Sequence, residues 1–150
     1  MNYKIPVSVL VILHTPSLEV LLLERASRPG FWQSVTGSID RLDEPLEDTA
    51  LREVREETGI DAAQYPLLRW NLVNTFEIYP QWRHRYRPGV TRNTEHVFSL
   101  ALPARLPVTV APDEHLAYLW LPWREAAEKC FSWSNRDAIL MLPQRAVART

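Results

Sequence analysis

Three glutamates, Glu53, Glu56 and Glu57, lie within one segment that reads as a helix. At roughly 100° per residue, Glu53 and Glu57 lie one turn apart on one face, and Glu56 lies on the same half of the helix. Like charges at this spacing oppose helix formation by about 0.2–0.5 kcal/mol per pair, so a compensating cation is expected. Carboxylate oxygens are the ligands that Mg²⁺ and Mn²⁺ select, and bound Mg²⁺ commonly also contacts substrate phosphates. The pattern favours a metal site for a polyphosphate over the alternative of a solvated acidic helix face.

The helix that must carry these carboxylates is predicted from Pro45 to Thr58. Proline is favoured at the first helical position, Glu44 can cap the helix just before it, and Gly59 is a typical stop signal. The adjoining half of the helix can face a hydrophobic core and hold the carboxylates in place; it carries Ala50, Leu51, Val54 and Thr58.

The rest of the chain predicts a mixed set of strands and two further helices. Apolar and β-branched runs predict extended segments at residues 6–13, 19–25, 31–36, 67–79, 94–102 and 116–121. A short helix is expected from Pro122 to about Cys130, and a last helix, capped by Ser134 or Asn135, toward Val147 with a kink at Pro143. These elements indicate an α+β layered fold.

Length and composition limit the possible functions. The 150 residues suit a single domain, 46% of them are hydrophobic, and the net charge of −1 argues against a stable nucleic acid or membrane partner. The single cysteine, Cys130, excludes an intramolecular disulfide and is expected to be a small packed residue. The apolar run at residues 7–13 is too short to cross a bilayer and lacks the features of a signal peptide, so a cytoplasmic location is expected.

The run from Gly37 to Ile60 resembles the Nudix box, the signature of the Nudix hydrolase family. That signature reads Gly, five residues, Glu, seven residues, Arg-Glu, an aliphatic residue, any residue, Glu-Glu, any residue, Gly and an aliphatic residue. From Glu44 onward the match is complete, but six residues separate Gly37 from Glu44. Asp43 stands at the usual distance from Gly37, whereas Glu44 keeps the helical register with Arg52, so we interpret the difference as a one-residue insertion in the loop.

The resemblance implies a Nudix-type α/β/α sandwich with a mixed sheet, spanning residues 1–150. It also implies that Glu53, Glu56 and Glu57 bind one or more Mg²⁺ ions, with Mn²⁺ as an alternative, and that Arg52 orients these carboxylates. The metal would neutralise phosphate charge and activate a water for attack on phosphorus.

Stretches outside the box resemble the bacterial branch of this family that hydrolyses dihydroneopterin triphosphate in folate biosynthesis; they include residues 31–38, 83–86, 88–95, 114–118 and 132–136. The resemblance implies a pyrophosphatase that releases pyrophosphate from this small-molecule triphosphate. It further implies Glu114 as an additional metal ligand and four substrate contacts, namely Lys4, Arg25, Thr36 and Ser132. The residues alone leave open a surface charge for Arg25, strand packing for Thr36 and a helix cap for Ser132.

The sequence is also compatible with two other functions. A housecleaning nucleoside triphosphate pyrophosphatase would use the same chemistry, because a purine and a pterin are both flat polar bicycles. A non-catalytic Nudix-like module that binds a nucleotide could dispense with the acidic helix, which this chain retains. The basic aromatic segment at residues 82–87 is expected to be a wall of the substrate site or a solvated loop, rather than a nucleic acid patch.

Overall fold

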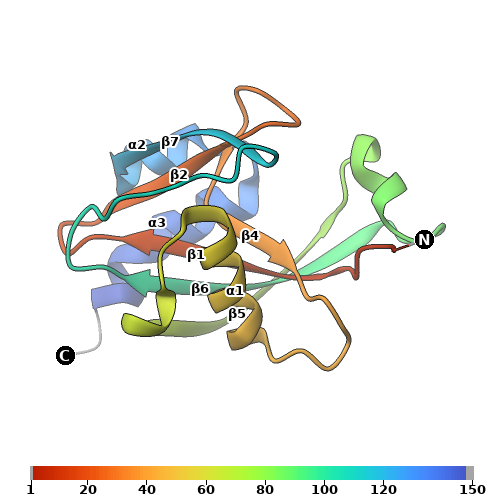
Figure 1. The fold of residues 1–150 in the computed structure, drawn as a ribbon, viewed down its shortest axis with the longest axis horizontal. Helices are drawn as coiled ribbons and strands as arrows, with labels where there is room; N and C mark the ends of the chain where they lie inside the picture. Colours follow the sequence, from red (N-terminus) through yellow and green to blue (C-terminus); the bar gives the residue numbers. More distant parts are fainter. Residues whose placement is uncertain (1, 148–150) are drawn as a thin grey trace.

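The computed structural model describes residues 2–147, which are built around a mixed seven-stranded sheet (Figure 1). The strands are β1 (Val7–His14), β2 (Glu19–Arg25), β3 (Trp32–Gln33), β4 (Val35–Ser38), β5 (Leu67–Glu77), β6 (Arg92–Ala101) and β7 (His115–Pro122). The main order is β3-β2-β1-β6-β5, while β4 pairs with β1 and β7 with β2. Strands β1 and β6 are parallel, and the other pairs are antiparallel.

Helices cover both faces of this sheet (Figure 1). Alternate residues of β1 point to opposite sides, as strand geometry requires. Val9 and Val11 pack with Val54 of α1 (Leu46–Thr58), whereas Leu10 and Ile12 pack in a second cluster with residues of α2 (Trp123–Lys129) and α3 (Trp133–Val147). The α/β/α layering implied by the resemblance is therefore confirmed.

The acidic helix is anchored as the sequence pattern predicts. Ala50, Val54 and Thr58 are fully buried, and Leu51 packs against the same cluster. Gly59 ends α1 in the left-handed conformation, with φ 75°, and its N–H donates to the Arg55 carbonyl. The packed side of α1 thus fixes the direction in which its glutamates project.

The start of α1 differs from the prediction. The helix begins at Leu46, and Pro45 is the extended N-cap residue without a side-chain hydrogen bond. Capping by Glu44 is therefore wrong: its carboxylate accepts instead from the Asp40 N–H and from Arg52. The Glu44 carboxylate pairs with Arg52 at this position and does not cap the helix.

Several other boundaries also differ from the sequence prediction. The predicted segment at residues 31–36 divides into β3 and β4, and the predicted loop at residues 80–93 contains a 3-10 helix, η2 (Pro80–Arg85), and the start of β6. A second 3-10 helix, η1 (Ala62–Gln64), follows α1. Helix α3 already includes Ser134 and Asn135, so capping by either side chain is wrong. The Ser132 hydroxyl accepts the Asn135 N–H at 3.2 Å in their place.

The C-terminal region agrees with two further expectations. Cys130 is half-buried and packs against the cluster beneath α2 and α3, as expected for a small packed residue. Pro143 lies inside α3, where the kink stays a prediction. In the described part of the chain, no helix combines the length and the apolar character needed to cross a membrane.

The pairing of β1 with β4 places Gly37 next to α1. Strand β1 pairs with β4 over Ser8–Val11, but it meets β2 only at His14. Strand β4 then leads through residues 39–45 directly into α1. Gly37 and Ser38 therefore lie beside the helix that carries the carboxylates.

Candidate active site

Arg52 is the centre of the polar network on α1. Its guanidinium grips Glu44 at both carboxylate oxygens, with Nε to Oε2 and Nη2 to Oε1 both at 3.1 Å. Nη1 donates to Glu53 Oε1 at 2.8 Å, and Nη2 donates to the Ser38 carbonyl at 3.1 Å. One side chain thus ties the loop, strand β4 and an acidic residue of the helix together, because a planar guanidinium can serve several acceptors at once.

Glu44, rather than Asp43, is the loop carboxylate of this network. The hydrogen bond from Arg52 is the main cause that lowers the pKa of Glu44 to about 2. Asp43 has an 84% exposed side chain and pairs with Arg41. The insertion between Gly37 and the helix is therefore absorbed in the loop, as the sequence analysis expected, and the Glu44–Arg52 register is kept.

Glu57 is the most deeply buried carboxylate of the helix. Only 2% of it is exposed, and neither carboxylate oxygen has a hydrogen-bond partner among residues 2–147. Burial raises the pKa of Glu57 well above its usual value, and the adjacent Glu53 and the more distant Glu114 raise it further. A buried, unpartnered carboxylate is costly unless a cation or donor completes it, so this position fits a divalent metal ligand.

Glu53 lies against Glu57 and against strand β4. Burial raises the pKa of Glu53, and contact with Arg52 opposes that rise. A Cβ atom at Gly37 would overlap the Glu53 carboxyl group, at well under 3.0 Å. Residue 37 must therefore be glycine for the Glu53 carboxylate to take this place.

The remaining predicted metal ligands are more exposed. Glu56 has a 52% exposed side chain and lies 3.5 Å from Arg52 Nη1, whereas Glu114 is exposed just before β7. Within residues 2–147, no three acidic, histidine or cysteine side chains already converge as a complete metal-binding group. The structure therefore brings Glu53 and Glu57 together, and it leaves Glu56 and Glu114 at the edge of the site.

His115 completes the buried surroundings of Glu57. Its Nε2 lies 3.6 Å from Glu57 Oε1, which is longer than a hydrogen bond. Burial, aided by the charge of Arg25, lowers the pKa of His115 to about 4. The imidazole is consequently neutral at pH 7 and does not neutralise Glu57.

Basic side chains line the same pocket as Gly37. Burial lowers the pKa of Lys4, and the charges of Arg85 and Arg25 lower it further. Burial likewise lowers the pKa of Arg25, again with help from Arg85. Arg25 also stacks on Trp82, with Cζ 4.4 Å from the ring centroid, and donates to Gln33 at 3.1 Å. Cationic side chains that lower one another's pKa in this way favour the binding of an anionic ligand between them.

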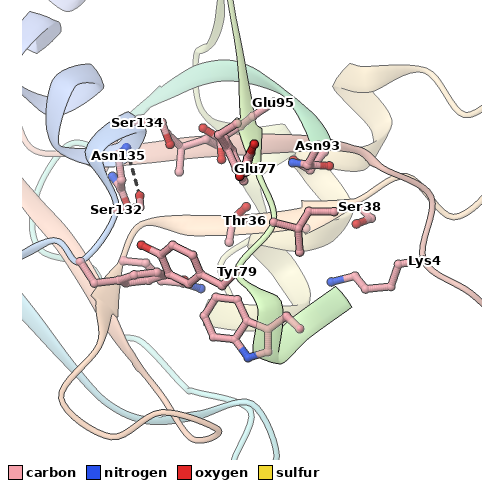
Figure 2. Close-up of a pocket in the computed structure, with 18 of the residues that line it drawn as sticks. Lys4, Thr36, Ser38, Glu77, Tyr79, Asn93, Glu95, Ser132, Ser134 and Asn135 are labelled. Carbon is pink, nitrogen blue, oxygen red and sulfur yellow. Dashed lines mark hydrogen bonds between the residues drawn. The ribbon is translucent and has the colours of Figure 1, made fainter. Parts of the chain in front are cut away.

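The residues that were predicted to contact the substrate lie around one pocket (Figure 2). Lys4, Arg25, Thr36 and Ser132 all line it, so the four predicted substrate contacts share one cavity. Figure 2 shows Lys4 and Ser38 on one side of the pocket, with Ser132 on the opposite side. The Thr36 hydroxyl donates to the Val9 carbonyl at 3.0 Å, and it keeps its acceptor capacity for a ligand.

Other residues of the pocket were not among the four predicted substrate contacts. Asn135 joins the start of α3 to the β3–β4 junction, because its amide accepts the Ser34 N–H at 2.7 Å and donates to the Ser34 hydroxyl at 3.0 Å. Trp82 lines the pocket, so the basic aromatic segment does contribute a wall. Glu95 and Asn93 are buried on β6, and each has a side-chain oxygen without a partner. In the sequence, Glu95 stood out only through the family resemblance of residues 88–95.

Comparison with known proteins gives matches over nearly the whole chain. A NUDIX domain model matches residues 4–142. The dihydroneopterin triphosphate diphosphatase of Escherichia coli K12 is 49% identical over 140 residues, which cover 91% of each chain. The protein of the same name from Haemophilus influenzae is 38% identical over 143 residues, covering 93% of this chain and 88% of that relative.

Solved structures give the same picture of the fold. The structure of the E. coli dihydroneopterin triphosphate pyrophosphohydrolase aligns with a TM-score of 0.86 at 48% identity, covering 93% of this chain and 95% of that chain. The NUDIX domain of Shewanella oneidensis NrtR, complexed with ADP ribose, aligns with a TM-score of 0.70 over 98% of this chain and 91% of that one. At 19% identity the second likeness concerns the fold alone.

Proposed function

The chain belongs to the NUDIX family, and from that premise we propose that it hydrolyses dihydroneopterin triphosphate to dihydroneopterin monophosphate and pyrophosphate with Mg²⁺. The observation that carries the chemical part is the buried carboxylate of Glu57, whose two oxygens lack partners beside Glu53. The substrate rests on the close relatives that bear this activity in their names.

Nudix hydrolases generally use a divalent metal, and the residues of this site fit one. Glu53 and Glu57 would hold Mg²⁺, and Glu56 and Glu114 would complete its surroundings from the exposed edge. Mn²⁺ would suit the same oxygen ligands. A bound divalent ion neutralises phosphate charge and lowers the pKa of a coordinated water, which supplies a nucleophile at neutral pH.

The protein's own residues position the reacting groups. Arg52 holds Glu53 at 2.8 Å and is itself fixed by Glu44, so the carboxylate cannot turn away when the anionic substrate enters. Lys4 and Arg25, which line the same pocket as Gly37, would bind phosphate oxygens. Fixed cations and carboxylates of this kind contribute by orientation and by electrostatic stabilisation, which dominate phosphoryl transfer.

The far side of the pocket would hold the rest of the substrate. The Ser132 hydroxyl accepts the Asn135 N–H, so its own hydrogen remains free to donate to a ligand. Tyr79, Trp82 and Phe131 form an aromatic cluster along the pocket, with the Tyr79 and Trp82 rings 5.3 Å apart. This arrangement suits a flat ring with polar substituents.

A nucleoside triphosphate pyrophosphatase is the second candidate. The aromatic cluster favours it as much as a pterin, since every nucleobase also has a flat face. A murine bis(5'-nucleosyl)-tetraphosphatase is 32% identical over 113 residues, which cover 75% of this chain. A non-catalytic nucleotide sensor is disfavoured, because such a module has no need of an unpartnered buried Glu57.

Product analysis on a panel of triphosphates tests the proposal. Purified protein with Mg²⁺ in ¹⁸O-water should release pyrophosphate from dihydroneopterin triphosphate, and the label identifies the attacked phosphorus. Glu57→Gln should lower kcat/KM by about three orders of magnitude or more. Glu47→Gln is the matched control, because Glu47 lies on the same helix but is half exposed and pairs with Arg69 at 3.5 Å. Fast hydrolysis of nucleotides without hydrolysis of the pterin would contradict the proposed substrate.

A further inference from the structure

Glu95 is a buried acid at the floor of the proposed substrate pocket. It lies outside α1, the helix that carries the predicted metal ligands. Only 5% of the residue is exposed, and its Oε1 has no hydrogen-bond partner among the described residues. Glu95 lines the same cavity as Lys4 and Ser132. In Figure 2 it projects toward the pocket beside Ser134, across from Tyr79. A buried acceptor that opens into a ligand pocket calls for a donor from the ligand.

Asn93 adds a second acceptor two residues earlier on the same face of β6. Its Nδ2 donates to the Ser8 hydroxyl at 2.8 Å, which orients the amide. Its Oδ1 is buried and has no hydrogen-bond partner in the part of the chain that the structure describes. Asn93 also lines the pocket. The floor therefore presents two acceptor oxygens, and a ligand that binds there must bring N–H groups.

The surroundings of Glu95 do not supply a cation for it. Burial raises the pKa of Glu95 to about 7, and only the Ser134 hydroxyl opposes that rise. By contrast, the carboxylate of Glu44 has its pKa lowered by a bidentate arginine. Glu95 is thus not one half of an internal ion pair, and a purely structural role leaves its free oxygen unexplained.

Resting on the proposed function, we propose that Glu95 is the specificity-determining residue of this pocket and accepts the adjacent ring N–H and exocyclic amino group of an aminopyrimidinone. Pterins and guanine share this edge, with two neighbouring donors that match the two oxygens of a carboxylate. Hypoxanthine lacks the amino group, and adenine presents a ring acceptor where the aminopyrimidinone has a donor. The aromatic cluster opposite Glu95 then covers the ring face.

Binding of phosphate-free rings tests this role separately from hydrolysis. Isothermal titration of the full chain without Mg²⁺ would compare pterin with lumazine, a bicycle that carries oxygen in place of the 2-amino group. The wild type should bind pterin at least about tenfold more tightly, because replacing the amino group removes a donor and sets an oxygen against the carboxylate. In Glu95→Gln the preference should fall below about threefold.

A matched control separates recognition from the general charge of the pocket. Glu77→Gln removes one negative charge from the same cavity, but the Glu77 side chain is 70% exposed and lies 3.8 Å from Arg83. This variant should keep the preference for pterin over lumazine. Melting curves verify that both variants fold, and the comparison of the two rings in the wild type needs no variant at all.

A kinetic comparison extends the test to triphosphates. The ratio of kcat/KM for GTP over ITP, which differ only in the 2-amino group, should exceed about tenfold in the wild type and approach one in Glu95→Gln. Equal or undetectable binding of both rings by the wild type overturns the assignment, and so does an unchanged preference in Glu95→Gln. If Glu95 governs ring choice but dihydroneopterin triphosphate is not hydrolysed, the proposed function fails and the role of Glu95 stands.

Discussion

The Glu53 carboxylate occupies the space where a side chain of residue 37 would begin, so that the glycine of β4 and the acid of α1 fit only as a pair. Gly37 also lines the pocket proposed for the substrate, so β4 contacts both this pocket and the acidic residue Glu53 of α1. Arg52 closes the same arrangement by contacting Glu53 and the carbonyl of the next residue, Ser38. Any added atom at residue 37 must displace a predicted metal ligand.

Gly37→Ala should therefore impair catalysis more than folding. The new methyl group pushes Glu53 away, and a misplacement of about 1 Å can lower kcat/KM roughly a hundredfold. The measurement is kcat/KM beside a thermal melt. Gly89→Ala is the control: Gly89 has φ 91° and open space around it, so that variant strains the backbone without touching Glu53. Equal activity in the two variants would contradict the fit between Gly37 and Glu53.

Glu57→Gln should lower the activity of the protein and raise its stability. Loss of a metal-binding carboxylate should lower kcat/KM by about three orders of magnitude or more. Burial raises the pKa of Glu57, so the folded protein favours the protonated carboxyl group. The stability that this group contributes is fully present below the ordinary glutamate pKa, and it is lost as the pH rises through the higher pKa of the folded state. At pH 8 in EDTA the amide variant should consequently unfold at a higher temperature than the wild type. A variant less stable than the wild type at pH 8, yet equally active, would argue against both roles.

Magnesium should stabilise the folded wild type. A ligand that binds only the native state adds about 2.7 kcal/mol to the free energy of unfolding at a concentration one hundred times its Kd. The melting temperature should rise as MgCl₂ is titrated into EDTA-treated protein, and the rise should be much smaller in Glu57→Gln. NaCl at matched ionic strength controls for screening. The same rise in both proteins would place the cation elsewhere.

The acidic helix was predictable because its information is local. Helical spacing put Ala50 and Val54 on the packed side, and the resemblance to the Nudix box put Glu44 in register with Arg52 despite the longer loop. The different exposure of these acids was not predictable from the sequence. The burial of Glu57 and the exposure of Glu56 depend on how β4 and β7 lie against the helix. The predicted roles of these acids remain proposals.

Residues of the far pocket wall show the limit of local reasoning more clearly. Ser132 was expected as a substrate contact or a cap, and the structure gives it the cap position as well as a place in the pocket. Glu95 received no role, since a strand residue's surroundings are set by the strands and helices that pack on it, here including Ser134 of α3. Contacts between segments that are distant in sequence form this part of the pocket. The spacing of residues within β6 therefore does not predict it.

The Glu44–Arg52 pair should make stability fall in acid. The hydrogen bond from Arg52 lowers the pKa of Glu44 to about 2, so the pair contributes above the unfolded pKa of 4.5 and is lost as the pH falls toward 2. The Glu44 side chain is 6% exposed, although solvent reaches Arg52, and we expect about 1–2 kcal/mol. Urea unfolding of wild type and Glu44→Gln should differ by this amount at pH 7 and converge toward pH 2.5. Asp43→Asn, which changes an exposed neighbour, should show little difference at either pH. A gap between wild type and Glu44→Gln that stays constant with pH would mean that the carboxylate's charge is not what Arg52 recognises.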